Sequence, residues 1–180
     1  MKQKISVFII HRWEKEEIYK RLMNILDNNK YLEINNLSMK VDKRVEKEEF
    51  WDDYACGLMT EADIIILVPD AEENEFIYES NTEYIGAGFH HINDSRIPHG
   101  VGYIREIQMA MFDSCNQVPV LIVGYSMVNS KYYYDLITKS PDWENRIFRN
   151  HFYMTTFDNL LNQQKTIKLF KKILEIRKRC

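Results

Sequence analysis

The chain has 180 residues, enough for one domain with a full hydrophobic core and too few for two comfortable ones. Apolar residues make up 45% of the sequence and the net charge is −3, so the composition gives no general reason to bind nucleic acid or an anionic membrane. The three cysteines, Cys56, Cys115 and Cys180, form no Cys-x-x-Cys pair, which argues against a zinc site or a disulfide framework. No signal peptide is recognisable, and no apolar run approaches the roughly 20 residues that span a bilayer. We therefore expect a cytoplasmic protein that binds neither membrane nor nucleic acid.

The first third of the chain predicts two strand–helix pairs. Residues 5–10 are β-branched and continuously apolar, as expected of a parallel strand that is covered on both faces. A helix follows at residues 14–27, then a strand at 31–35 and a helix at 45–61. The apolar stripe of the first helix comprises Ile18, Leu22, Ile25 and Leu26. The stripe of the second comprises Phe50, Tyr54 and Leu58.

The middle third holds the clearest strand and a long irregular segment. The strand expected at residues 63–69 begins with Asp63, a turn or cap residue, and is apolar and mainly β-branched from there on. The stretch of about 70–101 then breaks the pattern, and a connection of this length is usually functional or disordered. We expect residues 72–99 within this insertion to be the most mobile part of the chain when no ligand is bound. A helix at 103–115 and a buried strand at 118–124 follow.

The last third predicts a fifth strand and a long terminal helix. Tyr132, Tyr133 and Tyr134 could stack on a base, although a helix packing face or an oligomer contact explains them equally well. A strand is expected at 151–155 and a C-terminal helix at about 157–178, whose last turns are basic, as a solvated helix end favours. The inward residues of that helix are Leu160, Leu161, Ile167, Phe170, Ile173 and Leu174.

Strands and helices alternate along the whole chain, which predicts one α/β domain over residues 1–180. The expected architecture is a three-layer sandwich, with a central parallel sheet of about five strands and helices on both faces. In such sheets, ligands bind beyond the carboxyl ends of the strands. Four expected strand ends meet at that edge: His11 with Arg12, then residues 36–38, then Pro69 with Asp70, and then Gly124 with Tyr125.

A Gly-x-Gly sequence precedes the helix expected at residues 103–115. Gly100 and Gly102 allow the backbone to approach a ligand, and the first N–H groups of the helix favour a phosphate. Glu106 lies about one turn inside the helix, where a carboxylate could stabilise positive charge on a ribosyl carbon or accept a proton from a ribose hydroxyl. The alternative is an exposed Glu that is placed near a helix N-terminus by the helix dipole alone.

Two further groups of side chains suggest ligand binding. His11 and Arg12 could meet a pyrophosphate or a carboxylate, or lie in a solvated loop. His90, His91 and His99 suggest a metal, but no Asp, Glu or Cys cluster at ligand spacing accompanies them. We therefore expect no metal and no bound cofactor.

Several segments together resemble the opening of bacterial TIR-like domains, the group that includes the TIR subunit of the Thoeris anti-phage system. The resemblance covers roughly residues 4–124. The matching segments are residues 7–13, Tyr19, residues 22–26, residues 32–39, the pair Ala62-Asp63, Glu106-Ile107-Gln108-Met109-Ala110, and residues 119–122. The Glu-Ile-x-x-Ala sequence is similar to the context of the catalytic Glu in that family.

The resemblance implies a flavodoxin-like, TIR-like fold and an enzyme that takes NAD as a substrate and cleaves its nicotinamide–ribose bond. Some members make an ADP-ribose-derived signal molecule in antiviral defence. It implies that Glu106 is catalytic and that Phe8, His11, Asn36 and Ser38 line the nicotinamide side of the site. Assembly into a homo-oligomer, or an effector protein reached through a signal nucleotide, is implied as well.

Two other functions remain open. Gly100-Val101-Gly102-Tyr103, followed by Glu106, also resembles the Gly-Val-Gly-Tyr-Glu motif of nucleoside 2-deoxyribosyltransferases, in which the Glu attacks the sugar. Such an enzyme would bind its nucleotide with Tyr103 in the site, and a nucleotide or nucleoside N-hydrolase is a variant of the same function. The third alternative, from another class, is a TIR-like interaction module without catalysis.

Overall fold

The computed structural model describes residues 1–11, 16–40, 48–69, 103, 106, 107, 109, 110, 117–138 and 152–177. Within them, one sheet of five strands has the order β2-β1-β3-β4-β5, and every pair of neighbours is parallel. The strands are β1 (Gln3–Ile10), β2 (Leu32–Asn36), β3 (Ile64–Leu67), β4 (Val120–Gly124) and β5 (Phe152–Thr156). The predicted α/β fold with a central parallel sheet is confirmed.

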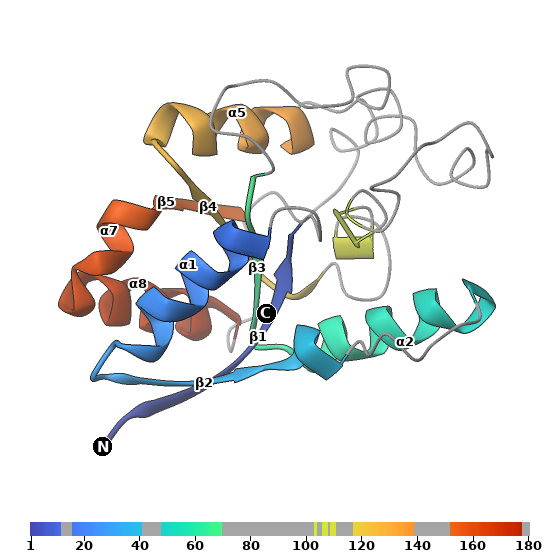
Figure 1. Ribbon diagram of the computed structural model, residues 1–180, viewed down its shortest axis with the longest axis horizontal. Coiled ribbons are helices and arrows are strands. Elements are labelled where there is room, and N and C mark those ends of the chain that lie inside the picture. Colours follow the sequence, from blue (N-terminus) through green and yellow to red (C-terminus); the bar gives the residue numbers. More distant parts are fainter. Residues whose placement is uncertain are drawn as a thin grey trace.

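Helices cover both faces of the sheet and complete three layers. One face packs against α1 (Glu16–Asp27), α7 (Phe157–Leu161) and α8 (Gln163–Arg177), which lie together in the left half of Figure 1. The other face packs against α2 (Glu48–Glu61) and α5 (Met127–Thr138). In β1, Val7 and Ile9 face the first layer, whereas Phe8 and Ile10 face the second. Burial on both faces explains why the strand sequences are continuously apolar rather than alternating.

The apolar stripe predicted for α1 is confirmed, whereas the stripe predicted for α2 is partly wrong. Ile18, Leu22 and Leu26 of α1 are buried. In α2, Tyr54 is 41% exposed, and the buried face is made by Ala55, Leu58 and Met59. The spacing of large apolar residues correctly included Leu58 but wrongly included Tyr54, and it passed over the small residue Ala55.

The predicted C-terminal helix is interrupted at Asn162, between α7 and α8. The backbone of Asn162 is extended (ψ 95°), and its Oδ1 accepts a hydrogen bond from the Lys165 N–H at 3.1 Å, which caps the start of α8. The Thr166 hydroxyl donates to the carbonyl oxygens of Leu160 at 2.9 Å and Asn162 at 3.0 Å. Because the break resets the helical phase, Leu161 is 60% exposed and not inward as predicted.

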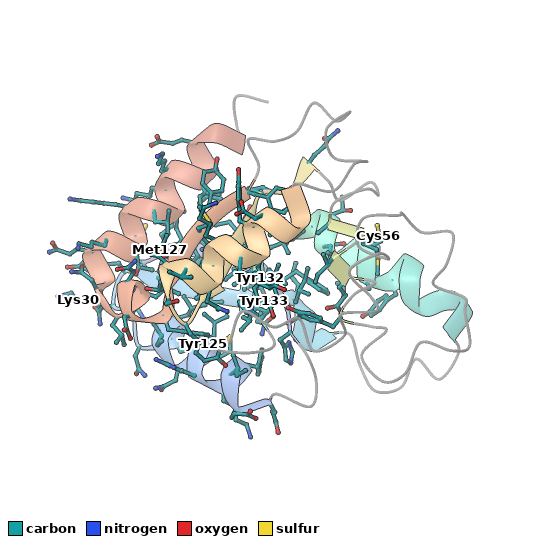
Figure 2. All side chains as sticks on the ribbon, turned by 90° about the horizontal axis from the view of Figure 1, so that it is seen from above. Lys30, Cys56, Tyr125, Met127, Tyr132 and Tyr133 are labelled. Atoms are coloured by element: carbon teal, nitrogen blue, oxygen red, sulfur yellow. The ribbon has the colours of Figure 1, made fainter. Side chains whose placement is uncertain are left out.

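Helix α5 contains the three consecutive tyrosines, to which the sequence assigned no element. The helix begins after Ser126, whose Oγ accepts a hydrogen bond from the Asn129 N–H at 3.1 Å. Tyr133 is fully buried against the sheet, and Tyr132 meets it edge-on with ring centroids 5.5 Å apart (Figure 2). The packing explanation of these tyrosines therefore holds for Tyr133.

Parts of the sequence-based predictions lie outside the described residues. These include the insertion at 70–101 with its expected mobility, Phe50's side chain, and most of the helix predicted at 103–115. The five described residues of that helix (Tyr103, Glu106, Ile107, Met109 and Ala110) all have helical backbone. None of the helices in the described ranges has the length and apolar character that crossing a membrane requires.

Gly124, at the carboxyl end of β4, is expected to tolerate no side chain. A Cβ at this position would lie 2.3 Å from Ser130 Oγ and 2.7 Å from the Ser130 backbone nitrogen. Ser130 cannot easily move, because its Oγ accepts from the Gly124 N–H at 2.9 Å and donates to the Thr155 carbonyl at 2.6 Å. We expect Gly124→Ala to lower the free energy of unfolding by about 1 to 3 kcal/mol, as measured by urea denaturation.

Gly57, in α2, provides the matched control, because a Cβ there would meet nothing within 4 Å. Gly57→Ala should stabilise the protein by up to about 1 kcal/mol, since alanine is the better helix former. Equal effects of the two substitutions would contradict the steric explanation for Gly124.

Candidate functional site

The carboxyl ends of the strands meet at one edge of the sheet, as the parallel pairing requires. After β1 the chain turns to β2 on one side, and it then returns across β1 to β3 on the other side. In sheets of this kind, ligands bind in the crevice where the strand order reverses, which here lies between the ends of β1 and β3. The pairing continues past the strands, since the Val68 N–H donates to the Ile10 carbonyl oxygen at 3.0 Å.

A helical turn is anchored directly at this switch point. The Tyr103 hydroxyl donates to the carbonyl oxygen of Val68 at 2.9 Å, and the Tyr103 side chain is only 1% exposed. Ile107 and Ala110 pack in the same core cluster as Tyr103. Glu106 lies three residues after Tyr103, a spacing that makes side chains neighbours on a helix. Tyr103, predicted to contact a ligand, therefore holds the turn that carries Glu106.

Glu106 is buried, with 6% of its surface exposed. Within the described part of the chain, no other side chain hydrogen-bonds to its carboxyl or forms an ion pair with it. Burial alone raises the pKa of the Glu106 carboxyl well above the usual range, because the charged form loses its hydration. The alternative that Glu106 is an exposed helix residue is wrong. A buried carboxyl with a raised pKa at a topological switch point is a typical feature of a functional site.

The raised pKa of Glu106 should make the free energy of unfolding depend on pH. Between the ordinary pKa of a Glu, about 4.3, and the raised pKa, the folded protein holds a proton that the unfolded chain has lost. The free energy of unfolding must therefore fall as the pH rises through this range. We expect Glu106→Gln to remove this fall and therefore to gain stability relative to the wild type as the pH rises from 4 to 8. Urea denaturation of both proteins at pH 4 and pH 8 measures the difference. A difference that does not grow with pH would contradict burial of the neutral acid.

His11, directly after β1, is partly buried and stacks on Tyr19 of α1. The ring centroids are 4.5 Å apart, and the planes are inclined by 22°. Burial lowers the pKa of His11, although the Ile9 carbonyl, 3.4 Å from Nδ1, and the nearby Glu16 carboxylate oppose this effect. A neutral imidazole is a weak partner for a pyrophosphate and a good one for a flat aromatic ring. The lowered pKa of His11 thus weakens the phosphate role considered from the sequence.

Asn36 and Ser38 occupy the end of β2, beside the end of β1. Asn36 Oδ1 accepts from the Ser38 N–H at 3.0 Å and from the Ser38 hydroxyl at 2.6 Å. Asn36 Nδ2 donates to the Tyr19 hydroxyl oxygen at 2.7 Å. Ser38, in the short helix η2 (Leu37–Lys40), is 9% exposed. His11, Tyr19, Asn36 and Ser38 therefore form one continuous group of contacts, which we call the β1–β2 wall.

The remaining predicted residues are placed as follows. Phe8 is fully buried in the core cluster on the α2 and α5 face, beneath the edge rather than on its surface. Arg12, Gly100, Gly102 and the three histidines at 90, 91 and 99 lie outside the described residues. Across the ranges that the structure does describe, no three side chains of His, Cys, Asp or Glu gather closely enough to hold a metal.

Two surface hollows lie at the opposite, amino edge of the sheet. The larger, of about 570 Å³, is lined by Lys2, Lys168 and Lys171 together with Tyr31 and Gln164. The second, of about 490 Å³, lies along β1 and β2, is lined by residues 4–6 and 33–35, and reaches Asp63 before β3. Asp63 Oδ2 accepts from the Ser6 N–H at 2.9 Å and thus completes the sheet pairing. We assign the site to the carboxyl edge, because the described lining of the amino-edge hollows offers no buried acid and no histidine.

The sequence missed Tyr19 as a member of the site and Val68 as the anchor of the Glu106 turn. Tyr19 belongs to the site only because α1 places it beside the ends of β1 and β2. That placement depends on the order of the strands in the sheet. Comparisons of the chain with protein-family models, curated protein sequences and solved structures give no match. The geometry and chemistry of the site therefore carry the functional conclusion.

Proposed function

We propose that the protein is a TIR-like enzyme that cleaves the N-glycosidic bond between nicotinamide and ribose in NAD, with Glu106 as its catalytic residue. The observation that carries the proposal is the buried Glu106 carboxyl, on a helical turn anchored by Tyr103 to the end of β3. A buried acid lowers the stability of the fold, and such acids are common in functional sites. The turn that carries Glu106 is anchored at the β1/β3 switch point, where sheets of this kind bind their ligands.

The charge of the substrate complements the buried carboxyl. The nicotinamide ring of NAD carries a formal positive charge, so binding beside Glu106 favours loss of the carboxyl proton. As nicotinamide departs, positive charge moves to C1′ and the ribose ring oxygen. A carboxylate that is already fixed in a site of low polarity stabilises this charge more in the transition state than in the ground state. Accepting a hydrogen bond from a ribose hydroxyl would orient the sugar.

The β1–β2 wall supports binding of the nicotinamide side. The neutral, stacked His11 offers a flat aromatic surface, and the Ser38 hydroxyl retains oxygen lone pairs after donating its proton to Asn36. Gly100 and Gly102 are the residues that we expect to approach phosphate. NAD is in this proposal a substrate and not a resident cofactor. A cyclic or conjugated product would act as a signal nucleotide on a partner effector protein, whereas free ADP-ribose would indicate simple hydrolysis.

Incubation with NAD, followed by chromatographic separation of the products, tests the proposal. We expect release of nicotinamide together with ADP-ribose or a cyclic or conjugated derivative. A parallel incubation with deoxynucleosides and a free base tests the deoxyribosyltransferase alternative, since Glu106 could attack a deoxyribose equally well. Assays at several protein concentrations include any assembled form. No cleavage of either substrate at any concentration would remove the enzymatic proposals and leave an interaction module.

A further inference from the structure

Among the residues that the structure describes, Tyr19 contacts the ends of both β1 and β2. Its ring stacks on His11 with centroids 4.5 Å apart. Its hydroxyl oxygen accepts a hydrogen bond from Asn36 Nδ2 at 2.7 Å. The two contacts use different parts of the side chain, the ring face and the phenolic oxygen. A substitution can therefore remove one and leave the other.

Asn36 has no hydrogen-bonding capacity left for a ligand. A side-chain amide has two N–H donors and two acceptor lone pairs on its oxygen. The donors reach the Tyr19 hydroxyl at 2.7 Å and Met23 Sδ at 3.6 Å, and the oxygen accepts twice from Ser38, at 3.0 Å and 2.6 Å. A ligand could bond to Asn36 only by breaking one of these contacts. Asn36 therefore acts on its neighbours rather than on a substrate.

We propose that Tyr19 is a positioning residue that fixes His11 relative to Ser38, through its ring on one side and through Asn36 on the other, so that the ends of β1 and β2 present one rigid binding surface. In this proposal, Asn36 is the second positioning residue and not the ligand contact that the sequence predicted. The use of this surface for nicotinamide rests on the proposed function, whereas the tie between the two strand ends does not.

Holding His11 and Ser38 in place before a ligand arrives should favour binding. His11 follows the last residue of β1, and Ser38 lies in η2, so neither side chain is held by regular sheet pairing. A ring stack and a short series of hydrogen bonds restrict both before a ligand arrives, and this restriction lowers the entropy cost of binding. Loss of the tie should therefore weaken substrate binding more than it slows the bond cleavage itself.

Three variants separate the two contacts. Tyr19→Phe removes the hydroxyl and keeps the ring on His11, whereas Tyr19→Leu removes both. Tyr31→Phe is the matched control, because the Tyr31 hydroxyl also has a side-chain partner, Gln164, but lies at the opposite edge of the sheet. NMR spectroscopy provides two readouts that need no activity: the pKa of His11, assigned with His11→Gln, and the hydrogen-exchange rate of the Ser38 amide.

We expect Tyr19→Phe to raise the Ser38 exchange rate about tenfold, the loss typical of one hydrogen bond, with the pKa of His11 still low. Tyr19→Leu should show the same exchange rate, and the pKa of His11 should move up toward its ordinary value as the ring becomes solvated. If the protein cleaves NAD, KM should rise about tenfold in both variants with kcat little changed.

Two results would overturn the proposal. One is a Tyr19→Leu variant that behaves as Tyr31→Phe does in both NMR readouts. The other is a change at only one of the two strand ends in Tyr19→Leu, because Tyr19 would then not link them. If Tyr19→Leu does not fold, an unchanged Ser38 exchange rate in Tyr19→Phe is sufficient to reject the tie. Absence of NAD cleavage affects the proposed function alone, since neither NMR readout depends on it.

Discussion

Replacing Glu106 by Gln is expected to lower the rate of N-glycosidic bond cleavage by about a hundredfold or more while the protein remains folded. The amide has nearly the same shape as the carboxyl but cannot carry the negative charge that stabilises the developing cation on C1′. The side chain is buried and its neutral form is the stable one in the folded protein, so the amide should fit without loss of stability. Steady-state turnover of NAD, measured beside a thermal unfolding curve, gives both results.

The pH dependence of turnover provides an independent check on Glu106. Its pKa is raised by burial, so the carboxylate form of the free enzyme becomes more abundant as the pH increases. We expect the kcat/KM of the wild type to rise as the pH approaches the raised pKa of Glu106, because this parameter reports ionisations of the free enzyme. The residual activity of Glu106→Gln should lack that rise.

Glu61→Gln is the matched control for charge removal, because Glu61 is an exposed residue at the end of α2 and its change should leave turnover unaltered. Turnover in Glu106→Gln equal to that of Glu61→Gln would remove Glu106 from the mechanism. It would also place the non-catalytic interaction module ahead of both enzymatic alternatives.

Replacing Phe8 by Ala is expected to lower the free energy of unfolding by about 3 to 5 kcal/mol. Phe8 is fully buried in the core cluster between the sheet and the α2 and α5 layer, so truncation leaves a cavity that the surrounding side chains cannot fill. For a domain of this size, the loss corresponds to a decrease in Tm of roughly 6 to 20 °C. Differential scanning calorimetry measures the change.

Phe8→Leu distinguishes a core role from the ligand contact that the TIR-like resemblance implies. Leucine retains most of the buried volume, and we expect a cost below about 2 kcal/mol and an unchanged KM for NAD. A large increase in KM without a change in Tm would show instead that Phe8 meets the substrate. His11→Ala should instead raise the KM for NAD with little change in Tm, because His11 lies at the edge beyond β1 and is only partly buried.

Local sequence patterns determine most of the layers in this protein. The three central strands were recognisable because each contains a short, mainly apolar run rich in Ile, Val or Leu, a composition typical of strands that are buried on both faces. The 3.6-residue spacing of Ile18, Leu22 and Leu26 similarly identified the buried face of α1. The errors in helices have local causes: Asn162 caps α8 with its own side chain, and the buried face of α2 includes the small residue Ala55 in place of Tyr54.

The sequence by itself determined that Glu106 lies in a helix near a strand-end edge, and it identified His11, Asn36 and Ser38 as residues of that edge. Only the tertiary structure decided what these residues do there. Burial of Glu106, anchoring of its turn on Val68, and the contacts of Tyr19 with His11 and Asn36 all depend on how separate elements pack together. Such contacts depend on the order β2-β1-β3-β4-β5, which is set by the packing of whole layers. No periodicity within a single segment encodes that order, because each strand would be equally apolar at any central position in the sheet.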